Sequence, residues 1–171
     1  YDRLLSIGDI SWTNYEVTVP MTLHGVRPEC SINVTSNPCD GGAALGVLMR
    51  WQGHHVDGRQ PHVEVVPFGA LGWYRWRASA SQGIITPALR LLGGNNVLLA
   101  SDSSQPFPVG ATYLLKMRAE TVGGQHEYKL KLWAQGQPEP AQWDLEGAQA
   151  LGDSLGNGSL LLVAPLLLAG R

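Results

Sequence analysis

The chain is poor in charge and in cysteine. Only 15% of its 171 residues are Asp, Glu, Lys or Arg, and it has two cysteines. Lys and Arg are scattered and the net charge is −2, which excludes the clustered basic surface that nucleic-acid binding requires. The apolar run from Leu160 to Ala169 is interrupted by Pro165 and is too short to span a bilayer. We therefore expect no nucleic-acid partner and no membrane span.

Turn-forming residues are plentiful instead. The chain contains 21 glycines and 11 prolines, and no long helical periodicity stands out. Its length suits one domain, residues 1–171, with a sizeable core. Many short strands joined by turns are typical of a β-sandwich or barrel.

The strongest pattern is a hairpin between Ala111 and Trp133. Apolar and polar residues alternate on both sides of Gly123-Gly124, which predicts two antiparallel strands with one buried face. The buried face would hold Tyr113, Leu115, Met117, Ala119, Tyr128, Leu130 and Leu132.

Further strands follow from shorter patterns. Alternation over 15–24 predicts a strand that Pro20 places at an edge or beside a bulge. In the strand expected over 43–51, Arg50 points away from the apolar side. Other expected strands are 62–67, 71–78, 87–92, 96–100 and 159–164, and one helical turn is expected near 146–150.

Four segments resemble a known group when read in order. They are Gly-Val-Leu-Met-Arg-Trp at 46–51, Tyr-Leu-Leu-Lys-Met-Arg at 113–118, Tyr-Lys-Leu-Lys-Leu-Trp at 128–133 and Glu-Pro-Ala-Gln-Trp at 139–143. The chain thereby resembles the concanavalin A-like (laminin-G-like) jelly-roll domains of secreted bacterial surface proteins. The resemblance implies an all-β, antiparallel jelly-roll sandwich. Such modules bind glycans, occasionally cleave them, or serve as structural and adhesive units.

Cys30 and Cys39 flank a turn-rich stretch, which favours a local disulfide in an oxidising compartment over two free thiols. Closing so short a loop contributes about 2.5 kcal/mol in the chain-entropy model. The chain starts at Tyr1 rather than Met, so we expect that a leader or upstream segment has been removed or left out. We expect the protein to be secreted or at the cell surface. Asn33 and Asn157 begin the two N-glycosylation sequons.

Catalytic patterns are weak. Glycoside hydrolysis needs paired carboxylates, and no strand carries alternating acids. Gln60-Pro61-His62 matches the first element of a polysaccharide-lyase site on this fold, with Arg50, Arg75 or Tyr113 to complete it, but solvated loop residues are the preferred interpretation. We therefore predict that the protein is not an enzyme.

Metal binding has two sets of candidate ligands. His54, His55 and His62 lie in one loop region, where a surface loop is the preferred interpretation. We expect no cofactor; the alternative is a structural calcium ion with oxygen ligands from Asp40, Asp57 and Asp102.

Aromatic residues give the candidate glycan site. Trp73, Tyr74 and Trp76 crowd one segment, and Trp133 falls on the polar face of its strand. Sugar rings stack on exposed indoles, although core packing would explain the first three equally well.

The end of the chain suggests a different role. Pro165, Leu166, Leu167 and Leu168 begin an apolar segment, 165–171, that would be unfavourable as an exposed edge. It could instead pair with a neighbouring subunit. We thus expect a non-catalytic structural or adhesive building block that assembles with copies of itself or a larger surface protein. The alternative is a carbohydrate-binding module; a polysaccharide lyase or hydrolase is the least favoured.

Overall fold

The computed structural model describes residues 3–24, 44–53, 68–78 and 85–164. In these ranges the chain forms ten strands, one short 3-10 helix (η2, Gly94–Asn96) and no α-helix. The strands are β1 (Arg3–Ile7), β2 (Tyr15–Thr22), β3 (Ala44–Trp51), β4 (Ala70–Ala78), β5 (Ile85–Gly93), β6 (Leu98–Asp102), β7 (Thr112–Val122), β8 (Gln125–Ala134), β9 (Leu145–Ala150) and β10 (Ser159–Ala164).

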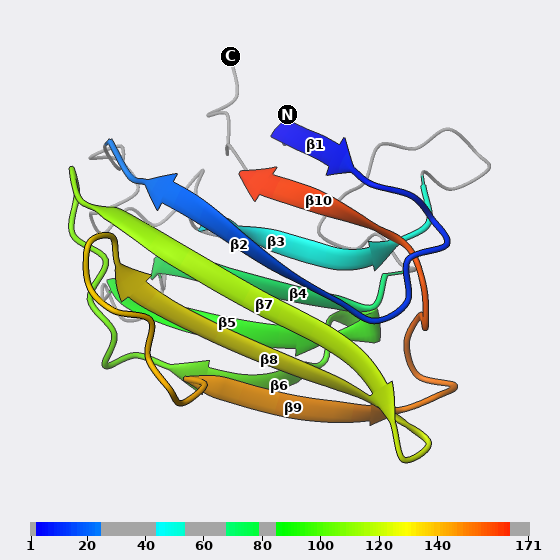
Figure 1. The fold of residues 1–171 in the computed structure, drawn as a ribbon. Helices are drawn as coiled ribbons and strands as arrows, with labels where there is room; N and C mark the ends of the chain where they lie inside the picture. The colour runs from blue at the N-terminus through cyan, green and yellow to red at the C-terminus, as the bar shows by residue number, and fades with distance from the viewer. Residues whose placement is uncertain (1–2, 25–43, 54–67, 79–84, 165–171) are drawn as a thin grey trace.

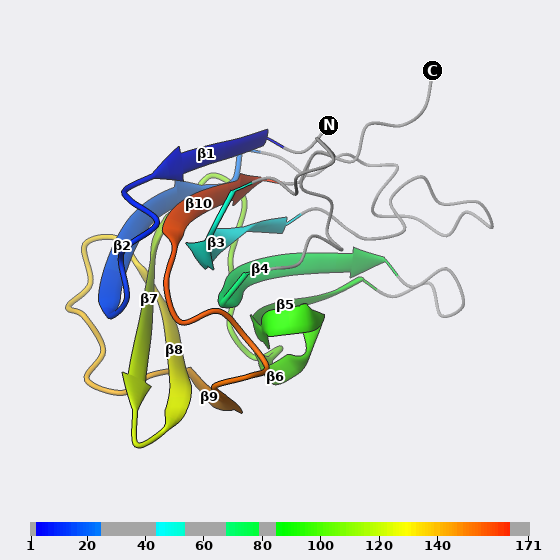
Figure 2. The same ribbon diagram turned by 90° about the vertical axis from the view of Figure 1, so that its right-hand side faces the viewer.

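The strands form two antiparallel sheets stacked as a sandwich (Figure 1). Sheet A has six strands in the order β1-β10-β3-β4-β5-β6, and sheet B has four in the order β2-β7-β8-β9. Figure 2 shows the two layers from the side. The prediction of an all-β antiparallel sandwich is confirmed. Across the described ranges, no helix is long and apolar enough to cross a membrane.

The predicted hairpin is confirmed in detail. β7 pairs with β8 through the two-residue turn Gly123-Gly124, where both glycines have positive φ values of 57° and 80°. That conformation is the one a tight hairpin requires, and it suits glycine. All seven residues expected on the inner face belong to the main core cluster or pack against it.

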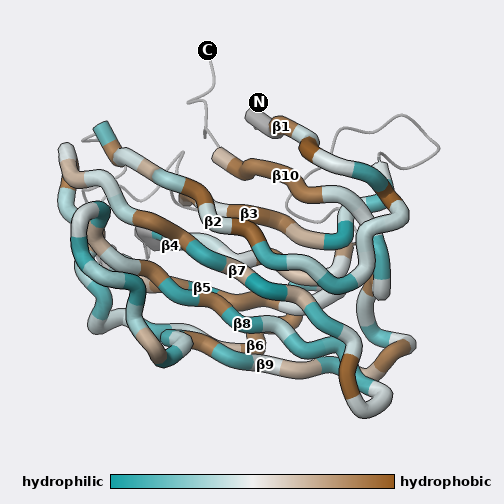
Figure 3. Tube along the Cα trace, viewed as in Figure 1, coloured by the Kyte–Doolittle hydropathy of each residue, from teal (hydrophilic) through white to brown (hydrophobic). Residues whose placement is uncertain are grey.

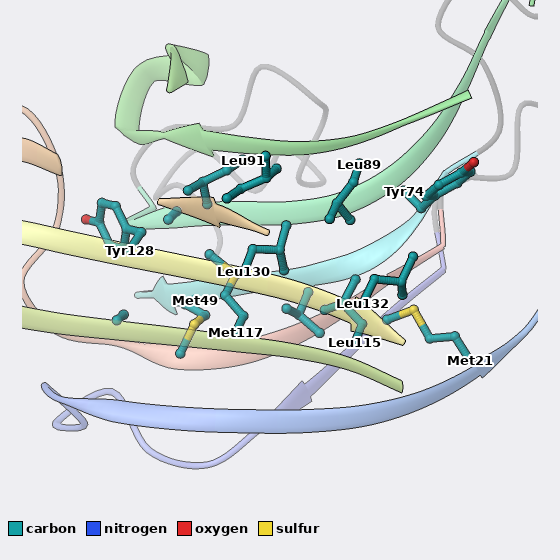
Figure 4. Packing of buried hydrophobic residues seen from close by; sticks show 14 of the residues in the cluster. Met21, Met49, Tyr74, Leu89, Leu91, Leu115, Met117, Tyr128, Leu130 and Leu132 are labelled. Carbon is teal, nitrogen blue, oxygen red and sulfur yellow. The ribbon is translucent and has the colours of Figure 1, made fainter. Parts of the chain in front are cut away.

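The core lies between the sheets (Figure 4). Leu89 and Leu91 of sheet A meet Met117 and Leu130 of sheet B there. Gly72 on β4 makes the close approach possible, because a Cβ at this position would lie 2.7 Å from Met117 Sδ. Hydropathy follows the burial: β10 is almost continuously hydrophobic, whereas β7 and β8 mix both characters (Figure 3).

Other strand predictions met different outcomes. Pro20 does lie on an edge strand, since β2 ends sheet B. The helical turn near 146–150 is wrong: these residues lie in β9, which pairs with β8, because edge pairing outweighs the helix propensity of the alanines. β1 was not predicted. The expected strand at 62–67 lies outside the described residues.

Candidate functional site

The larger sheet extends beyond the smaller one at β1. β9 packs against β5 and β6, and β7 packs against β3. Sheet B therefore covers sheet A from the β6 side, and its four described strands do not extend over β1. On β1, Leu5 pairs with Leu162 and Ile7 with Leu160, which puts Leu5 and Ile7 on the core side of sheet A. They are nevertheless 59% and 42% exposed. A strip of core-facing apolar surface is therefore uncovered.

A groove runs along this strip between β1 and β10 on one side and β2 on the other. Its narrow part has a volume of about 300 Å³ and its wide part about 760 Å³. Both parts are lined by Val19, Pro20 and Leu162, so they form one continuous depression, which we call the edge groove. The narrow part is completed by Leu5, Met21, Thr22, Leu45, Gly46, Val163 and Ala164, and the wide part by Ile7, Ser11, Trp12, Thr13, Asn14, Tyr15, Glu16, Val17, Thr18 and Leu160.

One wall of the groove is the outer edge of β2, which pairs with no second strand among the described residues. Every residue of β2 pairs with β7, including Pro20 opposite Leu114. Proline has no N–H, so it is tolerated where that position points away from the partner strand. Backbone groups point to alternate sides along a strand, so those of Glu16, Thr18 and Thr22 share this outward direction. They are the hydrogen-bonding groups of the open edge.

The wide end of the groove is fixed by Arg50, whose side chain is fully buried. The prediction that Arg50 points to the polar side is wrong because the β10–β3 register shifts between Ser159 and Leu161. Arg50 lies in this bulge with φ 59°, and a bulge redirects the side chain it carries. The side chain consequently reaches residues of the β1–β2 connection and of the β7–β8 hairpin.

Neutral groups solvate the buried guanidinium. Its Nε donates to the Thr13 carbonyl at 3.0 Å, and its Nη2 donates to Asn14 Oδ1 at 3.3 Å and to Thr121 Oγ1 at 3.1 Å. Nη1 donates to the Leu155 carbonyl at 3.3 Å. The backbone N–H of Arg50 donates to the Tyr15 hydroxyl at 2.7 Å. Thr13, Asn14 and Tyr15 line the groove, so Arg50 holds its wide end in shape.

His126 is the titratable neighbour of this network. Its Nδ1 lies 2.9 Å from Arg50 Nη1, and since a guanidinium only donates, Nδ1 accepts and the ring proton lies on Nε2. The ring is 4% exposed. Burial, and then the charge of Arg50, lower the pKa of His126. The imidazole is therefore held neutral.

Three of the four segments that carried the family resemblance, 113–118, 128–133 and 139–143, meet on the outer face of sheet B, whereas 46–51 lies in β3 of sheet A. Lys116 and Lys131 lie directly opposite each other, and the carboxylate of Glu139 binds both, at 2.8 and 2.6 Å. Lys131 also donates to the Pro140 carbonyl at 2.7 Å, and its Nζ lies 4.6 Å from the Trp143 ring centroid. We call these five residues the clasp. It holds the β8–β9 connection on the sheet.

The structure buries three of the predicted glycan-stacking residues, Trp73, Tyr74 and Trp133. Tyr74 belongs to the main core and donates to the Gln105 carbonyl, and Trp73 is buried in a second cluster with Phe68 and Leu71. Trp133 is on the outer face of sheet B as expected, but it is only 8% exposed beside Lys131. None of the three offers an open ring face. This corrects the expectation that a sugar stacks on them. The side chain of Trp76 lies outside what the structure describes.

Two other candidates have local structural partners. Asp102 Oδ1 accepts from the Ser104 N–H at 2.8 Å, and the described residues contain no cluster of three metal-binding side chains. Asn157 Nδ2 donates to the Ile10 carbonyl at 2.8 Å, and Oδ1 accepts from Gln52. A glycan on Asn157 would disturb the first of these bonds.

The remaining candidates lie outside the described residues. They are Cys30 and Cys39, Asn33, Asp40 and Asp57, the segments 54–55 and 60–62, and Pro165, Leu166, Leu167 and Leu168.

Sequence reasoning missed Trp12, which is 40% exposed at the wide end of the groove. Its ring packs over Gly8 and lies edge-on to Tyr15, with centroids 5.4 Å apart. The sequence gave little indication that Trp12 is functional, because residues 8–14 show no strand pattern. Only the return of the chain from β1 to β2 places this tryptophan at the groove.

The fold defines an antiparallel β-sandwich with an open apolar edge. No protein-family model matches the chain, and comparisons with curated proteins and with solved structures give no significant match.

Proposed function

We propose that this protein is a non-catalytic β-sandwich module that assembles by accepting an extended apolar segment in its edge groove. It would serve as a structural or adhesive building block, secreted or at the cell surface, joined to copies of itself or to a larger surface protein. The edge groove carries this proposal: core-facing side chains of sheet A are exposed where the described residues give sheet B no further strand.

The chemistry of the groove suits a strand better than a sugar. Its floor is aliphatic, with Leu160 and Leu162 beneath and Val17 and Val19 at the side. One wall is a strand edge, and strand edges recognise extended peptides through main-chain hydrogen bonds. Sugar sites need convergent polar groups, and Glu16 is already bound by Lys116 and Arg118.

We also propose that the sandwich is a jelly roll of the concanavalin A-like type. The clasp gives the Lys-x-Arg, Lys-x-Trp and Glu-Pro-x-x-Trp segments a common structural purpose, which supports a concanavalin A-like jelly roll. Those segments brace one face of sheet B. In this proposal these segments do not bind a partner, and the edge groove does.

Assembly can be tested at the groove by electron microscopy of dilute protein. Leu5→Glu places a charge on the exposed strip, and we expect it to disperse the filaments or arrays formed by the native chain. Leu98→Glu is the matched control, because Leu98 is 52% exposed on β6, the opposite edge of sheet A. Equal loss of assembly in both variants, or in neither, would contradict the proposal.

A carbohydrate-binding module is the second candidate, and Trp12 is the observation that favours it. This residue is 40% exposed, and it lines the wide part of the groove together with the polar residues Ser11 and Thr13. Retention of dispersed monomers on a polysaccharide gel, lost on Trp12→Ala, would favour this second function.

A further inference from the structure

We propose that the edge groove is filled by the segment 165–171 of a second copy of this chain, lying beside β2 as a fifth strand of sheet B. This rests on the proposed function and names its partner. The joint is heterologous, because one copy gives the segment and the other gives the groove. Contacts of this kind extend into filaments where they do not close into rings.

The chemistry of the segment matches the groove. It reads Pro-Leu-Leu-Leu-Ala-Gly-Arg, so it begins with four apolar residues and carries no acid. Extended, four residues cover about 13 Å, which is half the length of an eight-residue strand such as β2. The narrow part of the groove is lined by Leu5, Leu45 and Leu162. These side chains would bury the leucine side chains of the segment.

The start of the segment favours a second copy over the same molecule. Ala164, the last residue of β10, lies in sheet A at the mouth of the narrow part. To reach the position beside β2 in its own molecule, the chain would have to reverse and cross to sheet B. Stacked sheets lie about 10 Å apart, so the crossing uses about three residues. Leu168 would be the single leucine left to bury. The groove of a neighbouring molecule can bury Leu166, Leu167 and Leu168 together.

The edge of β2 limits how such a strand can pair. Glu16, Thr18 and Thr22 offer outward backbone groups, and Pro20 withholds one N–H between them. A long partner strand would lose a hydrogen bond at Pro20, whereas a short one can pair to either side of it. A proline on an edge also guards against indiscriminate strand addition. Pro20 on the edge of β2 therefore favours pairing with a short apolar segment.

Complementary variants test the joint. The donor-deleted chain lacks 165–171 and keeps its groove, and the groove-blocked chain carries Leu5→Glu and keeps its segment. We expect sedimentation velocity to show each alone as monomers and their equimolar mixture as one-to-one heterodimers. Leu98→Glu replaces Leu5→Glu as the control, and it should still polymerise by itself. A chain with Leu166, Leu167 and Leu168 changed to serine replaces the deletion if that chain fails to fold.

The contrary outcomes separate the two proposals. If the donor-deleted chain assembles like the native one while Leu5→Glu does not, another segment fills the groove; the partner named here is then wrong and the proposed function stands. If the native chain is monomeric throughout, both are wrong. A monomeric native chain whose melting temperature falls on deletion of 165–171 would show that the segment covers its own groove.

Discussion

At the scale of single residues, Arg50 organises the end of the sandwich. It is completely buried, and its donors are matched by carbonyl, amide, hydroxyl and imidazole groups. A buried cation is costly unless such partners are preset. Because the bulge at Arg50 depends on pairing between β3 and β10, strand alternation alone gave the wrong side for this residue.

His126 should make the fold sensitive to mild acid. Its pKa is lowered in the folded chain, so the unfolded chain binds the proton first as pH falls below about 6.5. Stability is therefore fully present above that pH and decreases below it, by about 1.4 kcal/mol for each pKa unit of depression.

Denaturant unfolding between pH 7.5 and 5 measures this effect. His126→Asn keeps an acceptor near Arg50 and removes the titration, so its unfolding free energy should vary less with pH over this window. Identical pH profiles for the native chain and His126→Asn would show that His126 does not contribute.

At the scale of elements, the clasp explains why β7 and β8 can carry lysines opposite each other. Like charges in directly opposed positions repel, and Lys116 and Lys131 would do so without an acid between them. The β8–β9 connection supplies that acid as Glu139. Tertiary contact thus makes a pair favourable that the hairpin by itself would disfavour.

Glu139→Ala should lower the melting temperature more than Glu146→Ala. Glu139 binds two lysines, one of them buried, whereas Glu146 pairs only with the more exposed Lys129. Equal effects of the two glutamate variants in thermal unfolding would contradict the clasp.

The sequence was most informative where local rules decide the structure. The alternation around Gly123-Gly124 predicted the hairpin, its turn and its buried face, because period two and a glycine turn are properties of neighbouring residues. β9 was missed because its pairing with β8 outweighs local propensity. For Trp73, alternation left core packing and an open ring equally possible, and the structure buries it with Ala44, Phe68 and Leu71. Trp133 was placed on the correct face, but its burial there was not predicted.

At the scale of the whole molecule, the decisive feature is the unequal size of the two sheets. Six strands face four, and the uncovered strip at β1 is lined by residues that elsewhere would be core. No local sequence pattern predicts this uncovered strip, because the strip depends on which strands of one sheet lie over which strands of the other. The edge groove is therefore a property of the fold, and its apolar floor is the basis of the assembly we propose.

Amide hydrogen exchange at two protein concentrations tests this account most directly. In the part of the chain that the structure describes, residues 15–22 form the edge of sheet B beside the groove, and residues 98–102 form the edge of sheet A far from it. An occupied groove predicts slower exchange within 15–22 when the protein is concentrated, because the added strand hydrogen-bonds the outward N–H groups of β2, with no change at 98–102. Exchange within 15–22 that is independent of concentration, in a sample that nevertheless assembles, would contradict the account.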